Sequence, residues 1–141
     1  MSQPHDASPL CILVIDDDQD TVDSFAILLQ QLGHAVHTAR RGPDALMQIE
    51  TIHPDLVFLD LALPGMDGFE IAKQIRREPR LSETKIIALT GLSEAKHRLR
   101  AQYTGIDGYL VKPATLEEIK ASIEAVRNTL LSSGQPTHPA C

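Results

Sequence analysis

Five short apolar runs, separated by amphipathic segments, constrain the fold of this 141-residue chain more than any other feature of its sequence. The runs cover residues 10–15, 35–38, 56–59, 86–89 and 109–111. The first, third and fourth runs are continuously apolar, which is typical of strands that are covered on both faces in a parallel sheet. The second run is short and contains His37 and Thr38, so we expect it at an edge of the sheet.

The segments between these runs have the periodicity of helices. In the first segment, apolar residues recur at intervals of three and four and fall on one helix face: Val22, Phe25, Ala26, Leu29 and Leu32. Pro43 predicts the first position of a second helix, and Asp67 predicts the N-cap of a third. Ser93 is a candidate N-cap for a fourth helix, and an apolar stripe at residues 116–130 predicts a fifth. Five alternating strand and helix units predict an α/β fold with a parallel sheet between helices.

Composition indicates one domain and limits the classes of partner. Residues 10–131 hold all five units, whereas residues 1–9 and 132–141 are polar or rich in Pro and Ser, so we expect disorder there. No apolar run approaches the roughly 20 residues that span a membrane, and the formal net charge of -6 argues against direct binding of nucleic acid. The N-terminus has no apolar signal segment, and two cysteines, Cys11 and Cys141, form no disulfide framework, so we expect a cytoplasmic protein.

Polar side chains stand where four of the five predicted strands end. Asp16 and Asp17 follow the first strand, Asp60 ends the third, Thr90 ends the fourth, and Lys112 follows the fifth. In open α/β sheets, ligands bind beyond the carboxyl ends of the strands, so we expect these side chains to share one site. Carboxylates at contact distance repel one another, so the site requires positive charge among them.

Four motifs in chain order resemble the receiver domain of bacterial response regulators. They are the acidic pair after the first strand, "LDLALPGMDGFE" around Asp60, "ALTG" after the fourth strand and "YLVKPA" after the fifth. The resemblance covers about residues 10–131 and is greatest to stand-alone, chemotaxis-regulator-like receivers. It implies a flavodoxin-like fold, a doubly wound five-stranded parallel sheet in the order 2-1-3-4-5 with helices on both faces. It also implies a cis bond before Pro113.

The resemblance assigns a phosphoacceptor and a metal site. Asp60 would take a phosphoryl group from a phosphohistidine and form an acyl phosphate. Asp16, Asp17 and Asp60, with the backbone carbonyl of Ala62, would bind Mg²⁺, a hard cation that prefers oxygen ligands. The metal would neutralise the crowded carboxylates and the incoming phosphoryl oxygens. Asp18 is expected to begin the first helix, where negative charge suits the helix dipole.

Three further residues have roles implied by the same resemblance. Lys112 would give a second positive charge to a phosphoryl oxygen, and the Thr90 hydroxyl would donate a hydrogen bond to another. Thr90 and Tyr109 would act as a switch, in which the hydroxyl moves toward the phosphate and the aromatic ring turns inward.

The resemblance implies a phosphoacceptor signalling protein and not an enzyme with a separate substrate. Such a protein catalyses only its own phosphotransfer and autodephosphorylation. The expected partners are a histidine kinase or histidine phosphotransfer protein and an unknown downstream protein. No interaction with a membrane is expected. Dimerisation on phosphorylation stays open. Two alternatives also stay open: a degenerate receiver that is not phosphorylated, and a haloacid-dehalogenase-type phosphatase. The phosphatase would use Asp18, Asp20 and Val22 as its nucleophile motif.

Overall fold

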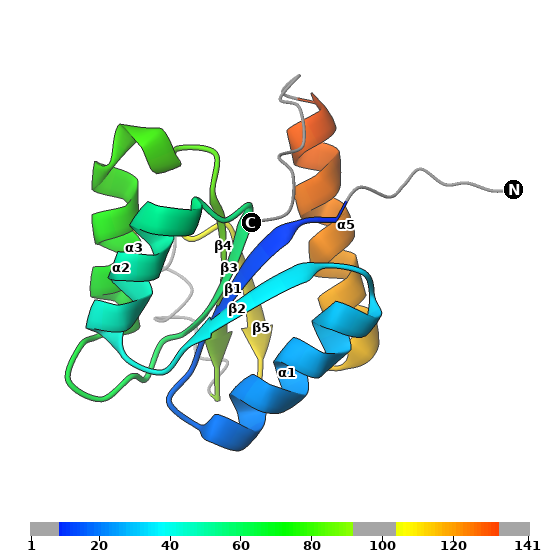
Figure 1. Cartoon of the computed structure of the whole chain (residues 1–141), viewed down its shortest axis with the longest axis horizontal. Helices are drawn as coiled ribbons and strands as arrows, with labels where there is room; N and C mark the ends of the chain where they lie inside the picture. The colour runs from blue at the N-terminus through cyan, green and yellow to red at the C-terminus, as the bar shows by residue number, and fades with distance from the viewer. Residues whose placement is uncertain (1–8, 92–103, 133–141) are drawn as a thin grey trace, which may run out of the picture.

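A computed structural model describes residues 9–91 and 104–132, with side chains described up to residue 129 (Figure 1). Five parallel strands form one sheet in the order β2-β1-β3-β4-β5. They are β1 (Cys11–Ile15), β2 (Ala35–Ala39), β3 (Leu56–Asp60), β4 (Lys85–Thr90) and β5 (Gly108–Val111). The predicted flavodoxin-like strand order is confirmed, and the second strand lies at an edge of the sheet, as expected.

Helices cover both faces of the sheet. Those in the described residues are α1 (Gln19–Gln31), α2 (Gly42–Ile52), α3 (Gly68–Arg77) and α5 (Leu116–Ser132), with the 3-10 turn η1 (Pro79–Leu81) after α3. Figure 1 shows α2 and α3 on one face of the sheet and α1 and α5 on the other. The predicted fourth helix, with its candidate cap Ser93, lies outside the described residues.

The sequence predicted the start of two helices correctly and placed the start of a third one residue too late. Asp18 caps α1 and Asp67 caps α3, each through its side chain. The second helix begins at Gly42, one residue before the predicted start at Pro43, and Arg41 is its extended N-cap residue. Proline is tolerated at either of the first two helical positions, because neither backbone N–H has a partner inside the helix.

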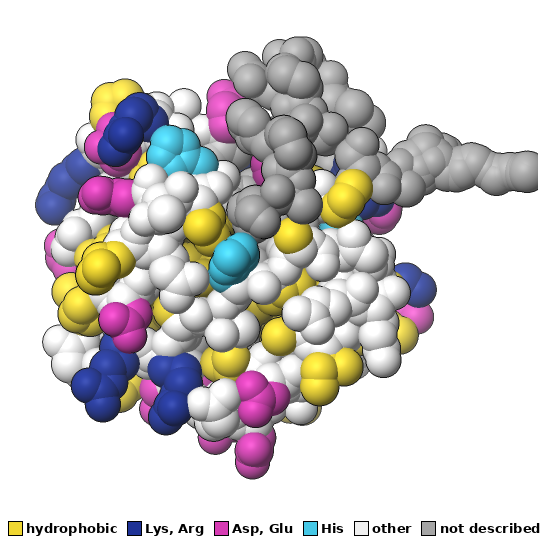
Figure 2. Space-filling model, viewed as in Figure 1, with side chains coloured by type: hydrophobic (Ala, Val, Ile, Leu, Met, Phe, Trp, Pro, Cys, Tyr) yellow, Lys and Arg dark blue, Asp and Glu magenta, His cyan; other side chains and the backbone are white. Residues whose placement is uncertain are grey.

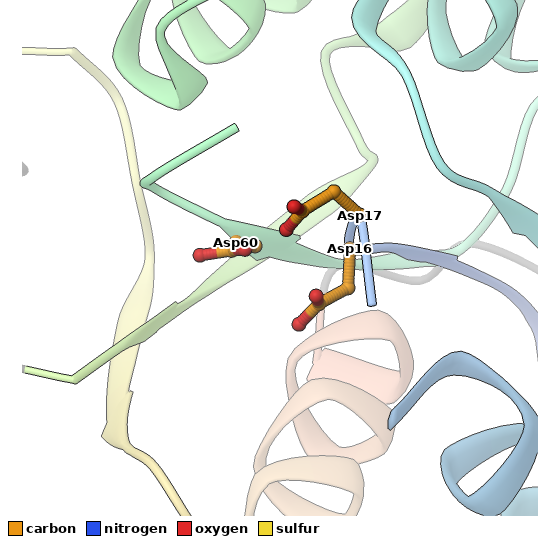
Figure 3. A group of neighbouring side chains, drawn as sticks. All are labelled: Asp16, Asp17 and Asp60. Carbon is orange, nitrogen blue, oxygen red and sulfur yellow. The ribbon is translucent and has the colours of Figure 1, made fainter. Parts of the chain in front are cut away.

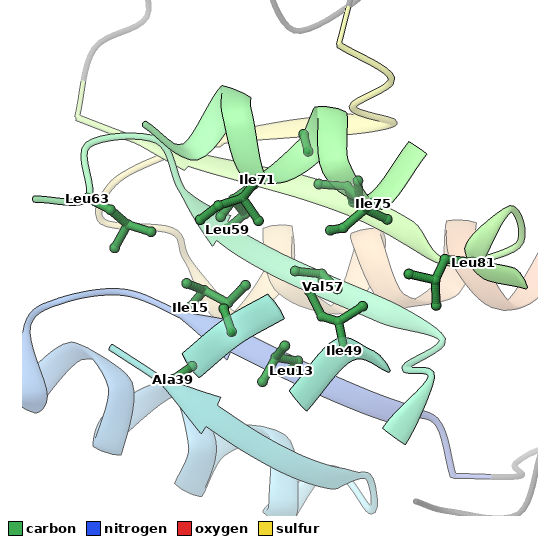
Figure 4. Close-up of a cluster of buried hydrophobic side chains, with 13 residues drawn as sticks. Leu13, Ile15, Ala39, Ile49, Val57, Leu59, Leu63, Ile71, Ile75 and Leu81 are labelled. Carbon is green, nitrogen blue, oxygen red and sulfur yellow. The ribbon is translucent and has the colours of Figure 1, made fainter. Parts of the chain in front are cut away.

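The apolar core has two layers, one on each side of the sheet. The layer under α2 and α3 joins β1 and β3 to these helices through buried aliphatic side chains (Figure 4): Leu13, Ile15, Ile49, Val57, Leu59, Ile71 and Ile75. The other layer packs Phe58 and its neighbours against α1 and α5. Every residue of β1 and β3 is buried, so close packing holds the carboxyl ends of these two strands at fixed positions.

Three further predictions can be compared with the described residues. The peptide bond before Pro113 is cis, as the family resemblance implied. Cys11 is disulfide-bonded, although the cysteine pattern suggested no disulfide framework; its partner lies outside the described residues. Among the described residues, no helix combines the length and the apolar character needed to cross a membrane. The two terminal segments expected to be disordered lie almost wholly outside the described residues, and that expectation stays a prediction.

Candidate functional site

Three carboxylates meet where the neighbouring strands β1 and β3 end. Ile15 pairs with Leu59 across the two parallel strands, so Asp16 and Asp60 occupy adjacent positions at the same edge of the sheet. Asp17 follows on the same turn, and each of the three offers an oxygen within 4.8 Å of the others (Figure 3). Figure 2 shows carboxylate side chains gathered at the lower edge of the molecule, where α1 begins. The convergence predicted for these three residues is confirmed.

Asp16 and Asp17 differ in their exposure. Asp16 is fully buried: its backbone N–H donates to the carbonyl oxygen of Ala39 at 3.1 Å, and its Oδ1 accepts from the Asp18 N–H at 3.0 Å. Asp17 is exposed. The pair therefore combines one carboxylate held by the protein with one that faces solvent.

The acceptor candidate Asp60 is held on a tight turn. It is 4% exposed, and its Oδ1 accepts from the backbone N–H of Ala62 at 3.0 Å. The first residue of α3, Gly68, packs so closely that a Cβ there would lie 2.6 Å from the Asp60 carbonyl oxygen. Burial raises the pKa of the Asp60 carboxyl, and the nearby Asp16 charge raises it further, whereas the Ala62 N–H and Lys112 lower it. The ionised form of Asp60 is thus destabilised by its surroundings.

Lys112 places one ammonium group among these acids. It follows β5, and its backbone N–H donates to the carbonyl oxygen of Thr90 at 2.6 Å. Its Nζ lies 2.6 Å from Asp16 Oδ2 and 3.4 Å from Asp60 Oδ2. Burial, the largest single influence, lowers the pKa of Lys112, but the ion pair with Asp16 and the charge of Asp60 together raise it above its ordinary value. Lys112 is therefore a cation that the acidic cluster stabilises.

The two proposed switch residues lie on the strands next to this cluster. Thr90 ends β4 and is 6% exposed, and it pairs with Val111 in β5. Tyr109 is half-buried and pairs with Ala88 two residues earlier along the same strands. Thr90 thus lies at the end of β4 and Tyr109 lies within β5, as predicted, whereas movement of either side chain stays a prediction.

The residues present fit a divalent cation. Three carboxylates and one ammonium leave two negative charges in the cluster, which equal the charge of one Mg²⁺ ion. All the side-chain donors are carboxylate oxygens, the ligands that Mg²⁺ prefers, and one carboxylate faces solvent, where bound waters can complete the coordination. Burial, and to a lesser extent the charge of Asp16, raise the pKa of Asp60, and a bound cation would stabilise its ionised form against both effects. Coordination by the Ala62 carbonyl stays a prediction.

Asp18 does not belong to the acidic cluster. Its carboxylate Oδ2 instead accepts from the backbone N–H and the hydroxyl of Thr21, at 3.0 and 2.6 Å. A phosphatase of the haloacid dehalogenase class would need this carboxylate as its nucleophile. In the structure Asp18 performs a helix-capping function, so the geometry does not support that alternative.

A cavity of about 390 Å³ adjoins the site between α1 and α5. Lys112, Pro113 and Ala114 line one side of it, and Phe25 and Leu28 of α1 line another. No pattern in the sequence indicates this cavity, because it depends on how two helices distant in sequence pack beside the loop after β5.

Comparison with known proteins places these features in one family. A sequence model of the response regulator receiver domain matches residues 12–124. RpaA, a DNA-binding dual master transcriptional regulator of Synechocystis sp., is 35% identical over 115 residues, which cover 82% of this chain and 48% of RpaA. PhoP, the alkaline phosphatase synthesis transcriptional regulatory protein of Bacillus subtilis, is 36% identical and is covered to 47%. The chain thus spans about half the length of these relatives.

Solved structures show the same similarity in three dimensions. The Vibrio cholerae chemotaxis protein CheY4 matches with a TM-score of 0.81 and 28% identity, and the match covers 84% of this chain and 99% of CheY4. The match therefore supports the same fold for most of this chain.

Proposed function

The chain belongs to the family of response regulator receiver domains of two-component systems, and on that premise we propose that Asp60 is its phosphoacceptor. The observation that supports this role best is the cluster of Asp16, Asp17 and Asp60. Lys112 Nζ lies in it, 2.6 Å from Asp16 Oδ2 and 3.4 Å from Asp60 Oδ2. The proposed receiver domain comprises residues 10–131. It acts in signal transduction and has no separate substrate to turn over.

In the proposed reaction, an oxygen of the Asp60 carboxylate attacks the phosphorus of a phosphohistidine on the partner. The new O–P bond gives an acyl phosphate, and the P–N bond breaks with its electron pair on the imidazole nitrogen, which remains on the partner. The carboxylate attacks in its ionised form, which carries no proton to remove, so the reaction needs no general base. Asp60 must nevertheless receive an anionic group while its own charge is disfavoured, and nearby positive charge is therefore the main requirement.

The residues around Asp60 meet that requirement. Lys112 lies close enough to donate to a phosphoryl oxygen once it releases Asp60 Oδ2, now at 3.4 Å. Asp16, Asp17 and Asp60, with the Ala62 carbonyl, would hold Mg²⁺, which supplies two further positive charges to the phosphoryl oxygens when bound.

The same site can transmit the phosphorylation state to a partner. A phosphoryl group on Asp60 would accept a hydrogen bond from the Thr90 hydroxyl at the end of the adjacent strand β4. The half-buried ring of Tyr109 on β5 would then turn inward, and the surface presented to other proteins would change. Hydrolysis of the acyl phosphate at the same site would end the signal.

The proposed phosphodonor is a histidine kinase or a histidine phosphotransfer protein of the cytoplasm. The cavity between α1 and α5 supports docking of the phosphodonor beside the site. Apolar side chains line this cavity, and Lys112 of the acidic cluster lines it as well. The phosphorylated protein passes the signal to a further protein. Phosphorylation-dependent dimerisation is one way in which it would do so. The DNA-binding activity named for RpaA belongs to a relative twice as long and is not proposed here.

A phosphotransfer panel tests this function. Purified histidine kinases and phosphotransfer proteins, radiolabelled on histidine, are mixed with the protein in the presence of Mg²⁺. At least one donor should transfer its label to the parent and none to the Asp60→Asn variant, and a chelator of Mg²⁺ should stop the transfer. A panel in which neither protein is labelled, with a small phosphodonor included, would favour the degenerate receiver.

A further inference from the structure

The third of the three consecutive aspartates makes two contacts in opposite directions. On one side, the Asp18 carboxylate caps α1 by accepting from the Thr21 N–H at 3.0 Å and the Thr21 hydroxyl at 2.6 Å. On the other side, the Asp18 backbone N–H donates to Asp16 Oδ1 at 3.0 Å. One residue thus connects the first turn of a helix to a buried carboxylate of the acidic cluster.

The cap determines where the Asp18 N–H points. The residue has extended backbone angles, φ -86° and ψ 116°, and its carbonyl oxygen accepts the first bond of the helix from Val22 at 3.0 Å. The side-chain bonds to Thr21 hold the peptide in this conformation. The same hydrogen bonds from Thr21 lower the pKa of Asp18, because they stabilise its ionised form.

The bond from Asp18 determines in turn how Asp16 presents its two oxygens. Asp16 is fully buried, and Oδ1 is engaged with the Asp18 N–H. The other oxygen, Oδ2, lies 2.6 Å from Lys112 Nζ. If the Asp18 N–H moved away, Oδ1 would lose its described donor, and the carboxylate could rotate out of this arrangement.

We propose that Asp18 is a positioning residue: by capping α1 it aims its own N–H at Asp16 and so directs Asp16 Oδ2 toward the cluster. This inference rests on the proposed Mg²⁺ site for its functional consequence. It predicts that the hydrogen-bonding shape of residue 18, and not its negative charge, determines how well the cluster holds the metal. Partners of metal ligands typically change metal affinity by about 10- to 100-fold when they are removed.

Four variants separate shape from charge. Asp18→Ser keeps an N-cap oxygen without the charge, Asp18→Glu keeps the charge on a side chain that caps poorly, and Asp18→Ala removes both. Asp20→Asn removes one exposed charge from the first turn of α1 and leaves the Asp18 cap in place, so it measures the effect of charge alone. Thr115→Ala removes the bond that the Glu118 N–H makes to the Thr115 hydroxyl at 3.1 Å, so it controls for loss of a helix cap elsewhere.

The first measurement is the Mg²⁺ dissociation constant, from a titration followed by amide shifts in NMR spectra. We expect affinity to fall roughly tenfold in Asp18→Ala and Asp18→Glu. It should stay within about twofold of the parent in Asp18→Ser, Asp20→Asn and Thr115→Ala. If Asp18→Glu binds like the parent and Asp18→Ser binds like Asp18→Ala, charge is the cause and the inference is wrong. Equal affinity in all the variants would also overturn it.

The second measurement needs no metal. Exchange of the residue 18 amide hydrogen reports its bond to Asp16 directly. It should be slow in the parent and in Asp18→Ser, and faster in Asp18→Ala and Asp18→Glu than in either. If the parent binds no Mg²⁺ but exchange follows this order, the proposed metal site fails and the positioning role stands. If exchange is equally fast in all four proteins, the positioning role fails whatever the metal does.

Discussion

Replacement of Lys112 by Met tests how the acidic cluster is stabilised, because Met keeps most of the apolar side chain and removes the charge. In the parent, Lys112 Nζ lies 2.6 Å from Asp16 Oδ2, and the exposed fractions of the two side chains are 31% and 1%. The variant would leave a buried carboxylate without its cationic partner, which is among the costly changes in a protein interior.

The size of the effect follows from this distance. At 2.6 Å and an effective dielectric constant of about 20, two unit charges attract by about 6 kcal/mol. Desolvation of both groups offsets much of this attraction, and water reaches Lys112, so the loss should be smaller than the roughly 3–5 kcal/mol seen when fully buried pairs are broken. We expect the free energy of unfolding at pH 7 without Mg²⁺ to fall by about 2 kcal/mol.

Mg²⁺ should reduce this difference in stability. Lys112 and the metal compete for the same carboxylates, so the variant should bind Mg²⁺ more tightly than the parent. Binding to the folded state alone stabilises it by an amount that grows with affinity. If the variant binds roughly tenfold more tightly, saturating Mg²⁺ recovers about 1.4 kcal/mol of the difference.

Urea unfolding followed by far-ultraviolet circular dichroism, with and without Mg²⁺, measures both effects. Lys73→Met is the matched control, because Lys73 is exposed on α3, and it should change stability by less than about 0.5 kcal/mol. A loss in Lys112→Met no larger than in this control would refute the electrostatic reasoning. A full loss that Mg²⁺ leaves unchanged would refute the idea that the two cations serve the same carboxylates.

Three further predictions concern the turn after Asp60, the opposite edge of the sheet and the cavity beside the site. Gly68→Ala should lower the free energy of unfolding by about 2 kcal/mol in urea, because its Cβ would meet the Asp60 carbonyl oxygen at 2.6 Å; an unchanged midpoint would show that the loop yields. Burial, and then the charge of Arg127, lower the pKa of His34, whose Nδ1 accepts from the Leu10 N–H at 3.0 Å. Stability from neutral His34 is thus present above its unfolded pKa of about 6.5 and is lost as pH falls through the lowered folded value. His34→Asn, which keeps an acceptor, should reduce the pH dependence of the urea midpoint, and the same slope in both proteins would contradict this. Ala114→Phe should fill the cavity between α1 and α5 and slow transfer from a protein phosphodonor roughly tenfold, the equivalent of about 1.4 kcal/mol; equal slowing with a small phosphodonor would show damage to the site and not to docking.

The sequence predicted the acidic cluster because its information is local to two strands. An apolar run that ends in Asp16 and Asp17, and another that ends in Asp60, must bring these residues together if the strands are adjacent and parallel. The strand order follows from family resemblance and is confirmed by the structure. The same reasoning placed Thr90 and Lys112 at the carboxyl edge of the sheet.

The sequence did not predict how these side chains pair. Lys112 lies closer to Asp16 than to Asp60, although β5 is further from β1 than from β3 in the sheet. The pairing depends on the reach of a long side chain and on the loop after β5, and neither has a periodic signal in the sequence. The double contact of Asp18 was missed for a similar reason, because a backbone N–H has no residue-type signature.

The identity of the phosphorylated residue tests the assignment of Asp60 most directly. The parent and the Asp60→Asn variant are incubated with a small phosphodonor and Mg²⁺, and the products are weighed by mass spectrometry before and after treatment with hydroxylamine, which cleaves acyl phosphates. The parent should carry one phosphoryl group, which hydroxylamine removes, and the variant should carry none. Equal phosphorylation of Asp60→Asn, or a modification of the parent that resists hydroxylamine, would contradict the assignment of Asp60 as the phosphoacceptor.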